Sequence, residues 1–272
     1  MQKTKIALSM ISAAALLALT ACGGGGGDSA PAAPQQPVNP PAPAITVSGS
    51  TSAVAGDPLA VVFVPHTETS TRPAFQSISH AAFPAQFQKA TAEGAYTQLG
   101  IDGNSLITLA GGKVVEVAGN GDFAIGRWTD GSSSIGSVSG NQGDHYAVGK
   151  PLKLAQVLGM GKTLSCTLIA ATNPTAISGN FAAGKVNSAT ALIDLNGPFL
   201  QNVSLDVSIG SDAHATANIV GTVVNGLTQS NGVLHHVQTF GTSQSQPLLA
   251  VGYAMPTPSS GDVTGVVVLK CQ

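Results

Sequence analysis

The chain has 272 residues and a formal net charge of −2, with 11 Lys and Arg against 13 Asp and Glu. This balance excludes the strongly basic surface on which nucleic-acid binding depends. Charged residues make up only 9% of the sequence and aromatic residues 4%, whereas Gly occurs 33 times, so the composition favours an exported β protein over a helical cytosolic enzyme.

The first 21 residues have the pattern of an export signal. Lys3 and Lys5 form a short positive region, and residues 6–19 form an apolar stretch that is short for a membrane span. Residues 19–22 (LTAC) then resemble the lipobox of bacterial lipoproteins. This resemblance implies that 1–21 is a signal peptide that is removed, and that the thiol of Cys22 carries a diacylglycerol, with further acylation such as palmitate on the new amino group.

Residues 22–44 are expected to form a tether, because they contain no apolar periodicity. A run of glycines at 23–27 gives way to a proline-rich segment, which favours an extended spacer that reaches on the order of 50 Å from the membrane. Gly23, rather than Asp, follows the lipobox cysteine. By resemblance to sorting rules of enterobacterial lipoproteins, this implies the outer membrane, with the protein on the periplasmic or the surface face.

Residues 45–150 are expected to form an N-terminal mixed β domain with one short helix. Asn-Gly, Asp-Gly and Gly-Gly pairs punctuate short apolar runs, which is typical of β-hairpins. Pro84 suits the first turn of a helix, so the helix is expected at 84–93. The expected strands are 45–48, 59–64, a hairpin of 106–110 and 113–118 around Gly111-Gly112, then 122–129 and 145–148, with turns that include Asp130-Gly131 and a loop at 132–142.

Four residues on two of these strands are candidates for ligand binding: Arg127, Trp128, His145 and Tyr146. Trp128 is the only Trp in the chain. Strand alternation places Arg127 and Trp128 on opposite faces. In one interpretation, a groove is lined by Trp128, Arg127 and Tyr146. In the other, Trp128 packs as core between the two folded regions.

Residues 151–272 are expected to form a C-terminal antiparallel up-and-down β-barrel of about eight strands. The clearest strand is 203–209, where apolar and polar residues alternate strictly. Inward side chains are expected to be small or apolar, and they either fill the barrel or surround a small apolar ligand. The strands are expected at 163–171, 185–195, 203–209, 213–224, 233–240, 248–255 and 263–271, with an eighth candidate at 181–182, and the inward set includes Ala213, Ala215, Ala217, Ile219, Val263 and Val267.

Two cysteines remain once Cys22 is assigned to the lipid. Cys166 and Cys271 form an even pair in an oxidising compartment, which favours one disulfide. They lie in the first and last expected barrel strands. Because these strands are neighbours in a closed meander, the disulfide is expected to join the two at the closure.

The order of lipobox, Gly-rich tether, β-rich region and C-terminal barrel resembles the surface lipoproteins of Gram-negative bacteria, among them transferrin-binding protein B and factor H-binding protein. Residues 178–195 and 203–209 are similar to the repeated Gly-led hairpins of their barrels. The resemblance implies a lipid-anchored scaffold that binds a protein or small-molecule partner. No ligand-contacting residue of that family maps onto a position of this chain.

Motifs for other chemistry are incomplete. Residues 161–163 (GKT) resemble the end of a phosphate-binding loop, but Gln156 stands where that motif needs Gly. His235 and His236 point to opposite faces of a strand and cannot readily share a metal. Without a Gly-x-Ser-x-Gly motif either, we expect a non-catalytic binding module without metal. The alternatives are a binder of a small apolar molecule in the barrel and a structural envelope component.

Overall fold

The computed structural model describes residues 44–159 and 161–272. The predicted signal peptide, the predicted lipidation site Cys22 and all but the last residue of the predicted tether lie outside the described residues. The described part is 61% strand and 1% helix, which confirms the mainly β fold class. Within it, no helix has the length and apolar character needed to cross a membrane.

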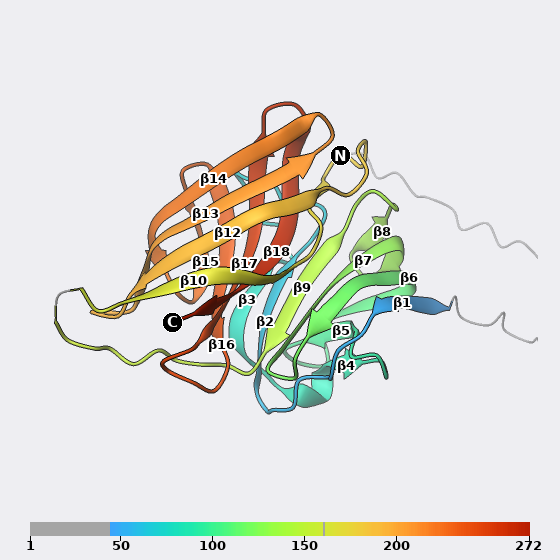
Figure 1. Ribbon diagram of the computed structural model, residues 1–272. Helices are drawn as coiled ribbons and strands as arrows, with labels where there is room; N and C mark the ends of the chain where they lie inside the picture. The colour runs from blue at the N-terminus through green and yellow to red at the C-terminus, as the bar shows by residue number, and fades with distance from the viewer. Residues whose placement is uncertain (1–43, 160) are drawn as a thin grey trace, which may run out of the picture. The chain divides into compact units, whose positions relative to one another are not determined.

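The first sheet curls into a half-barrel (Figure 1). Its strands follow the order β3-β2-β9-β7-β6-β5-β4, while β1 pairs in parallel with β6, and β8 pairs with β7. The nine strands are β1 (Ile45–Gly49), β2 (Leu59–Val64), β3 (Ile78–Phe83), β4 (Lys89–Ala90), β5 (Tyr96–Gly100), β6 (Leu106–Gly119), β7 (Phe123–Ser133), β8 (Gly136–Val138) and β9 (Asp144–Gly149).

The predicted hairpin at 106–118 is wrong, because β6 runs straight through it. Gly111 and Gly112 form an irregularity at which the register with β7 shifts. Gly112 has φ +126°, and a Cβ there would lie 2.6 Å from the Cα of Gly131. The glycines therefore permit two long strands to approach closely. The predicted turn at Gly131 is wrong for the same reason, and the predicted loop at 132–142 contributes residues to β7 and β8.

The predicted helix at 84–93 is reduced to one 3₁₀ turn, η1 (Ala85–Phe87), after which the chain enters β4. Gln88 explains the change. Its side-chain amide donates to the carbonyl of Pro84 at 2.8 Å and to that of Gly100 at 2.6 Å, and it accepts from the Gly100 N–H at 3.0 Å. These bonds hold the chain at the end of β5, where a longer helix would lose them.

The second sheet is a nearly closed barrel whose eight main strands follow one another in chain order. β10 and β18 pair across the seam. The wall is open only between β14 and β15, where the Ser230 hydroxyl bonds to the N–H and carbonyl of Val220. The eighth strand is β15, in place of the candidate at 181–182. The strands are β10 (Thr163–Ala171), β12 (Lys185–Asp194), β13 (Phe199–Ile209), β14 (Asp212–Val223), β15 (Gly226–Ser230), β16 (Val233–Phe240), β17 (Leu248–Thr257) and β18 (Gly261–Cys271), with the short β11 (Thr175–Ala176) beside β18.

Side chains fill the barrel. Tyr253, Met255 and Val267 belong to one apolar cluster and have no exposed surface, so no solvent-sized space remains beside them. The alternation predicted for 203–209 is confirmed. Ala213 was predicted to point inward and is exposed, because the pairing of β13 with β14 shifts near Ile209. The other five predicted inward residues belong to the cluster.

The predicted disulfide is confirmed. Cys166 and Cys271 face each other in the β10–β18 register and are bonded, with their Cα atoms 3.9 Å apart. Both side chains lie in the barrel core. The disulfide therefore joins the first and last strands of the barrel.

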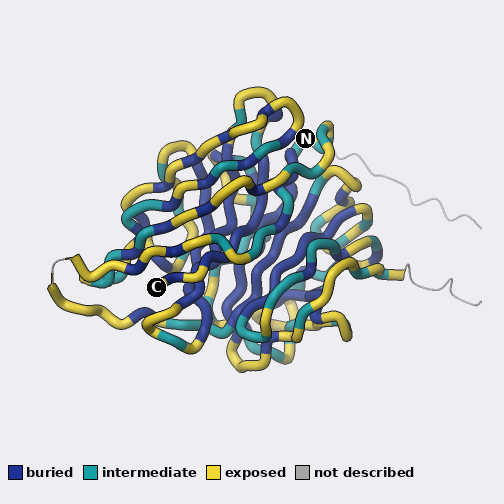
Figure 2. Tube along the Cα trace, in the orientation of Figure 1, coloured by how far each residue is buried: buried dark blue, intermediate teal, exposed yellow. Residues whose placement is uncertain are grey.

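The half-barrel packs against the outer wall of the barrel. β2 contacts β16 and β17, and β9 contacts β18. Buried residues run continuously from one sheet to the other (Figure 2). Gly252 makes this approach possible, because a Cβ there would lie 2.5 Å from a methyl group of Val64 and 2.7 Å from one of Val62. Each barrel strand at this junction thus has both faces covered.

Candidate functional site

The four predicted binding residues are all buried, so none is placed to meet a ligand at the surface. Trp128 and Tyr146 lie in the half-barrel core with no exposed surface, and their ring centroids are 6.4 Å apart. The Trp128 indole N–H donates to the carbonyl of Tyr96 at 2.7 Å. Trp128 therefore packs as core, but inside the half-barrel and not between the two sheets.

Arg127 and His145 are also buried. They lie among polar contacts that join the half-barrel to the segment after β10. Arg127 forms a two-pronged ion pair with Glu116, with distances of 2.6 and 3.1 Å. The same carboxylate accepts from the N–H of Asn173 at 2.8 Å. The two ring nitrogens of His145 bond to the hydroxyls of Thr172 and Thr175 at 2.8 and 2.9 Å.

Burial keeps His145 neutral in the folded protein. Desolvation, the positive charge of Arg127 and the nearby His66 together hold its pKa well below the ordinary value. In the unfolded chain this histidine takes up a proton near pH 6.5. Since the unfolded state then binds the extra proton, stability is complete above pH ~6.5 and falls as the pH drops toward the folded pKa.

We expect the buried, neutral His145 to lower the free energy of unfolding by about 1.4 kcal/mol for each pH unit below pH ~6. Urea midpoints measured from pH 7.5 to 5 check this, with His145→Gln showing the shallower slope. His80→Gln is the matched control, because His80 is exposed. Equal slopes for the wild type and His145→Gln contradict the assignment.

The segment between β2 and β3, residues 65–77, projects from the half-barrel and is here called the anchored loop. Glu68 organises it from within. Its buried carboxylate accepts from the Ser77 hydroxyl, from the N–H of Ala74 at 3.4 Å, and from Nε2 of His236 on β16 at 2.6 Å. Because Glu68 and His236 are both 0% exposed, this pair ties the loop to the barrel in a dry environment.

Further contacts hold the first half of the loop. His66 donates from Nδ1 to the carboxylate of Asp144 at 2.7 Å, and its backbone N–H donates to the same oxygen at 2.9 Å. The N–H of Ser70 donates to the carboxylate of Asp262 on β18 at 2.7 Å, and Gln229 on β15 donates to the carbonyl of Ser70 at 2.7 Å. The base of the loop is therefore fixed by three barrel residues, Gln229, His236 and Asp262, and by Asp144 of the first sheet.

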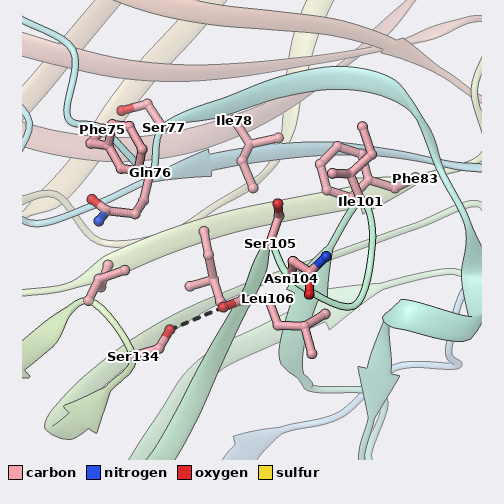
Figure 3. Close-up of a pocket in the computed structure, with 12 residues that line it drawn as sticks. Phe75, Gln76, Ser77, Ile78, Phe83, Ile101, Asn104, Ser105, Leu106 and Ser134 are labelled. Carbon is pink, nitrogen blue, oxygen red and sulfur yellow. Dashed lines mark hydrogen bonds between the residues drawn. The ribbon is translucent and has the colours of Figure 1, made fainter.

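The tip of the anchored loop is exposed. The Phe75 side chain is 98% exposed, the largest value among the large apolar residues described. It lies between two hollows. One, of about 510 Å³, continues along β3 to Phe83 and the start of β6 (Figure 3). The other, of about 460 Å³, is lined by the loop itself, including Arg72. A fixed base with an exposed aromatic tip is an arrangement suited to binding a partner.

Sequence reasoning missed the anchored loop. Glu68 and His236 are 168 positions apart in the chain, and neither belongs to a motif. The prediction that His235 and His236 face opposite ways is confirmed, since His235 bonds to Thr222 at 2.9 Å while His236 bonds to Glu68.

No cluster of three or more His, Cys, Asp or Glu residues suited to a metal occurs in the part of the chain that the structure describes. No protein family, curated protein or solved structure matches this chain.

Proposed function

We propose that the chain is an outer-membrane lipoprotein whose folded part is a non-catalytic binding module, presented to its partner by the anchored loop. The observation that carries this proposal is the exposed Phe75 on a loop whose base is held by the buried Glu68–His236 pair. The lipobox at 19–22 supports the anchor, and the scaffold would follow the architecture of transferrin-binding proteins. A rigid loop loses little entropy on binding, which favours recognition.

The filled barrel weighs against a ligand in its lumen. Tyr253 and Met255 occupy the interior that a lipocalin-like ligand would need. A structural envelope component without a partner remains the alternative, and it gives no reason for an exposed aromatic side chain on a fixed loop.

The lipid anchor is tested by metabolic labelling with an alkyne analogue of palmitate. We expect label on the wild type and none on Cys22→Ala, because the Cys22 thiol is the group that the lipid requires. Label that persists on Cys22→Ala contradicts the anchor. Protease treatment of intact cells then distinguishes the surface face from the periplasmic face.

The binding role is tested by capture on immobilised protein from serum and from cell-wall extract, quantified by mass spectrometry. We expect Phe75→Ala to capture about tenfold less of a component that the wild type captures, because the substitution removes a central aromatic contact. Leu158→Ala is the matched control, because Leu158 is 76% exposed and lies on the connector before β10. Equal capture by all three proteins contradicts the role of the loop.

A further inference from the structure

The larger hollow lies at the open side of the half-barrel. The first sheet ends at β3 on one side and at β4 on the other, and these ends do not pair. The lining comes from the anchored loop, β3, the β5–β6 connection, β6 and the β7–β8 turn (Figure 3). Phe83 and Ile107 form the floor; they are 4% and 7% exposed and belong to the half-barrel core. The hollow is therefore open to solvent, with part of the half-barrel core as its floor.

The chemistry of the lining selects against charge. None of its twelve residues is charged. The floor is apolar, and the exposed part of the lining combines apolar Phe75 and Ile101 with hydrogen-bonding side chains such as Asn104 and Ser105. A charged ligand would lose hydration here without gaining a counter-charge. An uncharged, largely apolar ligand with few hydrogen-bonding groups matches this lining.

The size of the hollow distinguishes a small molecule from a protein surface. Its volume of about 510 Å³ lies within the range of roughly 300–1,000 Å³ typical of small-molecule sites. A stable protein interface needs a far wider contact, about 800 Å² on each partner.

We infer that this hollow binds an uncharged, largely apolar small molecule. The inference rests on the proposed binding function and adds the class of ligand. The site lies in the half-barrel and not in the barrel, whose interior is filled. Phe75 borders the hollow and also forms the loop tip, so the ligand would lie directly beside the surface that meets the partner.

The test uses a matched pair of fluorescent probes. N-phenyl-1-naphthylamine is uncharged, and 1-anilinonaphthalene-8-sulfonate has the same ring system with a sulfonate. The protein is titrated into a fixed low concentration of each probe. We expect a Kd on the order of 100 µM for the neutral probe, the affinity that the usual ligand efficiency gives a molecule of this size. We expect at least about tenfold weaker binding of the anion.

Two pairs of variants locate the probe. Ser105→Asp places a carboxylate at the hollow and is expected to weaken the neutral probe about tenfold, whereas Ser137→Asp, also at an exposed Ser but outside the hollow, leaves it unchanged. Ile101→Ala removes a side chain that lines the hollow. Ile169→Ala, on β10, is its control, because the Ile101 and Ile169 side chains have similar exposure, 42% and 44%. Thermal melts confirm that each variant is folded.

Equal binding of both probes, or binding that neither Ser105→Asp nor Ile101→Ala weakens, overturns the inference. If the probe results fail while capture still depends on Phe75, the proposed ligand site is wrong and the proposed binding module is supported. If capture fails while the probe binds as expected, the ligand site in the hollow is supported and the proposed partner surface is wrong.

Discussion

Reduction of the Cys166–Cys271 disulfide is expected to lower the free energy of unfolding by about 4–5 kcal/mol. The bond closes a loop with a sequence separation of 105 residues. Removing a cross-link that closes so long a loop returns conformational entropy to the unfolded chain. For a loop of about 100 residues, the chain-entropy estimate of this stabilisation is about 4.7 kcal/mol. The effect is large because the closed loop spans the whole barrel, from β10 to β18.

Urea unfolding with and without reductant measures this loss. A double variant, Cys166→Ala with Cys271→Ala, is the control: its midpoint is expected to lie near that of the reduced wild type and to ignore the reductant. A change of less than about 1 kcal/mol on reduction would show that strand pairing alone closes the barrel.

Removing the Glu68 side chain is expected to cost about 3–5 kcal/mol, because it leaves several buried hydrogen-bond donors without an acceptor, at about 1–3 kcal/mol each. Nδ1 of His236 already lacks a hydrogen-bond partner among the described residues. Glu68→Ala would leave Nε2 unpaired as well, and it would release the Ser77 hydroxyl and the N–H of Ala74 inside the loop.

A double-mutant cycle with His236→Leu measures the coupling directly. We expect the double variant to recover part of the loss, because replacing both partners by apolar groups removes the unpaired ring. Asp206→Ala is the matched control, because Asp206 also pairs with a histidine, at 2.9 Å against 2.6 Å for Glu68, but at the surface, where His214 is 72% exposed. That change is expected to cost at most about 1 kcal/mol. Equal losses at Glu68 and Asp206 contradict the anchoring role.

Local periodicity predicted most of the barrel. The strands at 163–171 and 233–240 were predicted with the bounds that the structure shows, and the alternation in 203–209 matches the buried face of β13. Gly111-Gly112 misled the prediction, because a pair of glycines is compatible with both a turn and a bulge. Which one forms depends on Gly131, a partner that local sequence does not identify.

The site was much less predictable than the fold. Alternation placed Arg127 and Trp128 on opposite faces, as the structure shows, but it could not reveal that a second sheet covers the outer face. The exposed Phe75 and the buried Glu68 have no periodic pattern around them. Glu68 bonds to β16, and Ser70 of the same loop bonds to β15 and β18, all of which follow more than 140 residues later in the chain.

The proposed role of the anchored loop requires that the loop be rigid before any partner binds. Backbone ¹⁵N relaxation of residues 65–77 tests this in the free protein. We expect order parameters near ~0.85 through the tip at Arg72 and Phe75, and a fall below ~0.6 in Glu68→Ala, with β10 unchanged as the internal reference. Order parameters below ~0.6 at the tip of the wild-type loop would contradict the claim, because a mobile loop does not present Phe75 in one position.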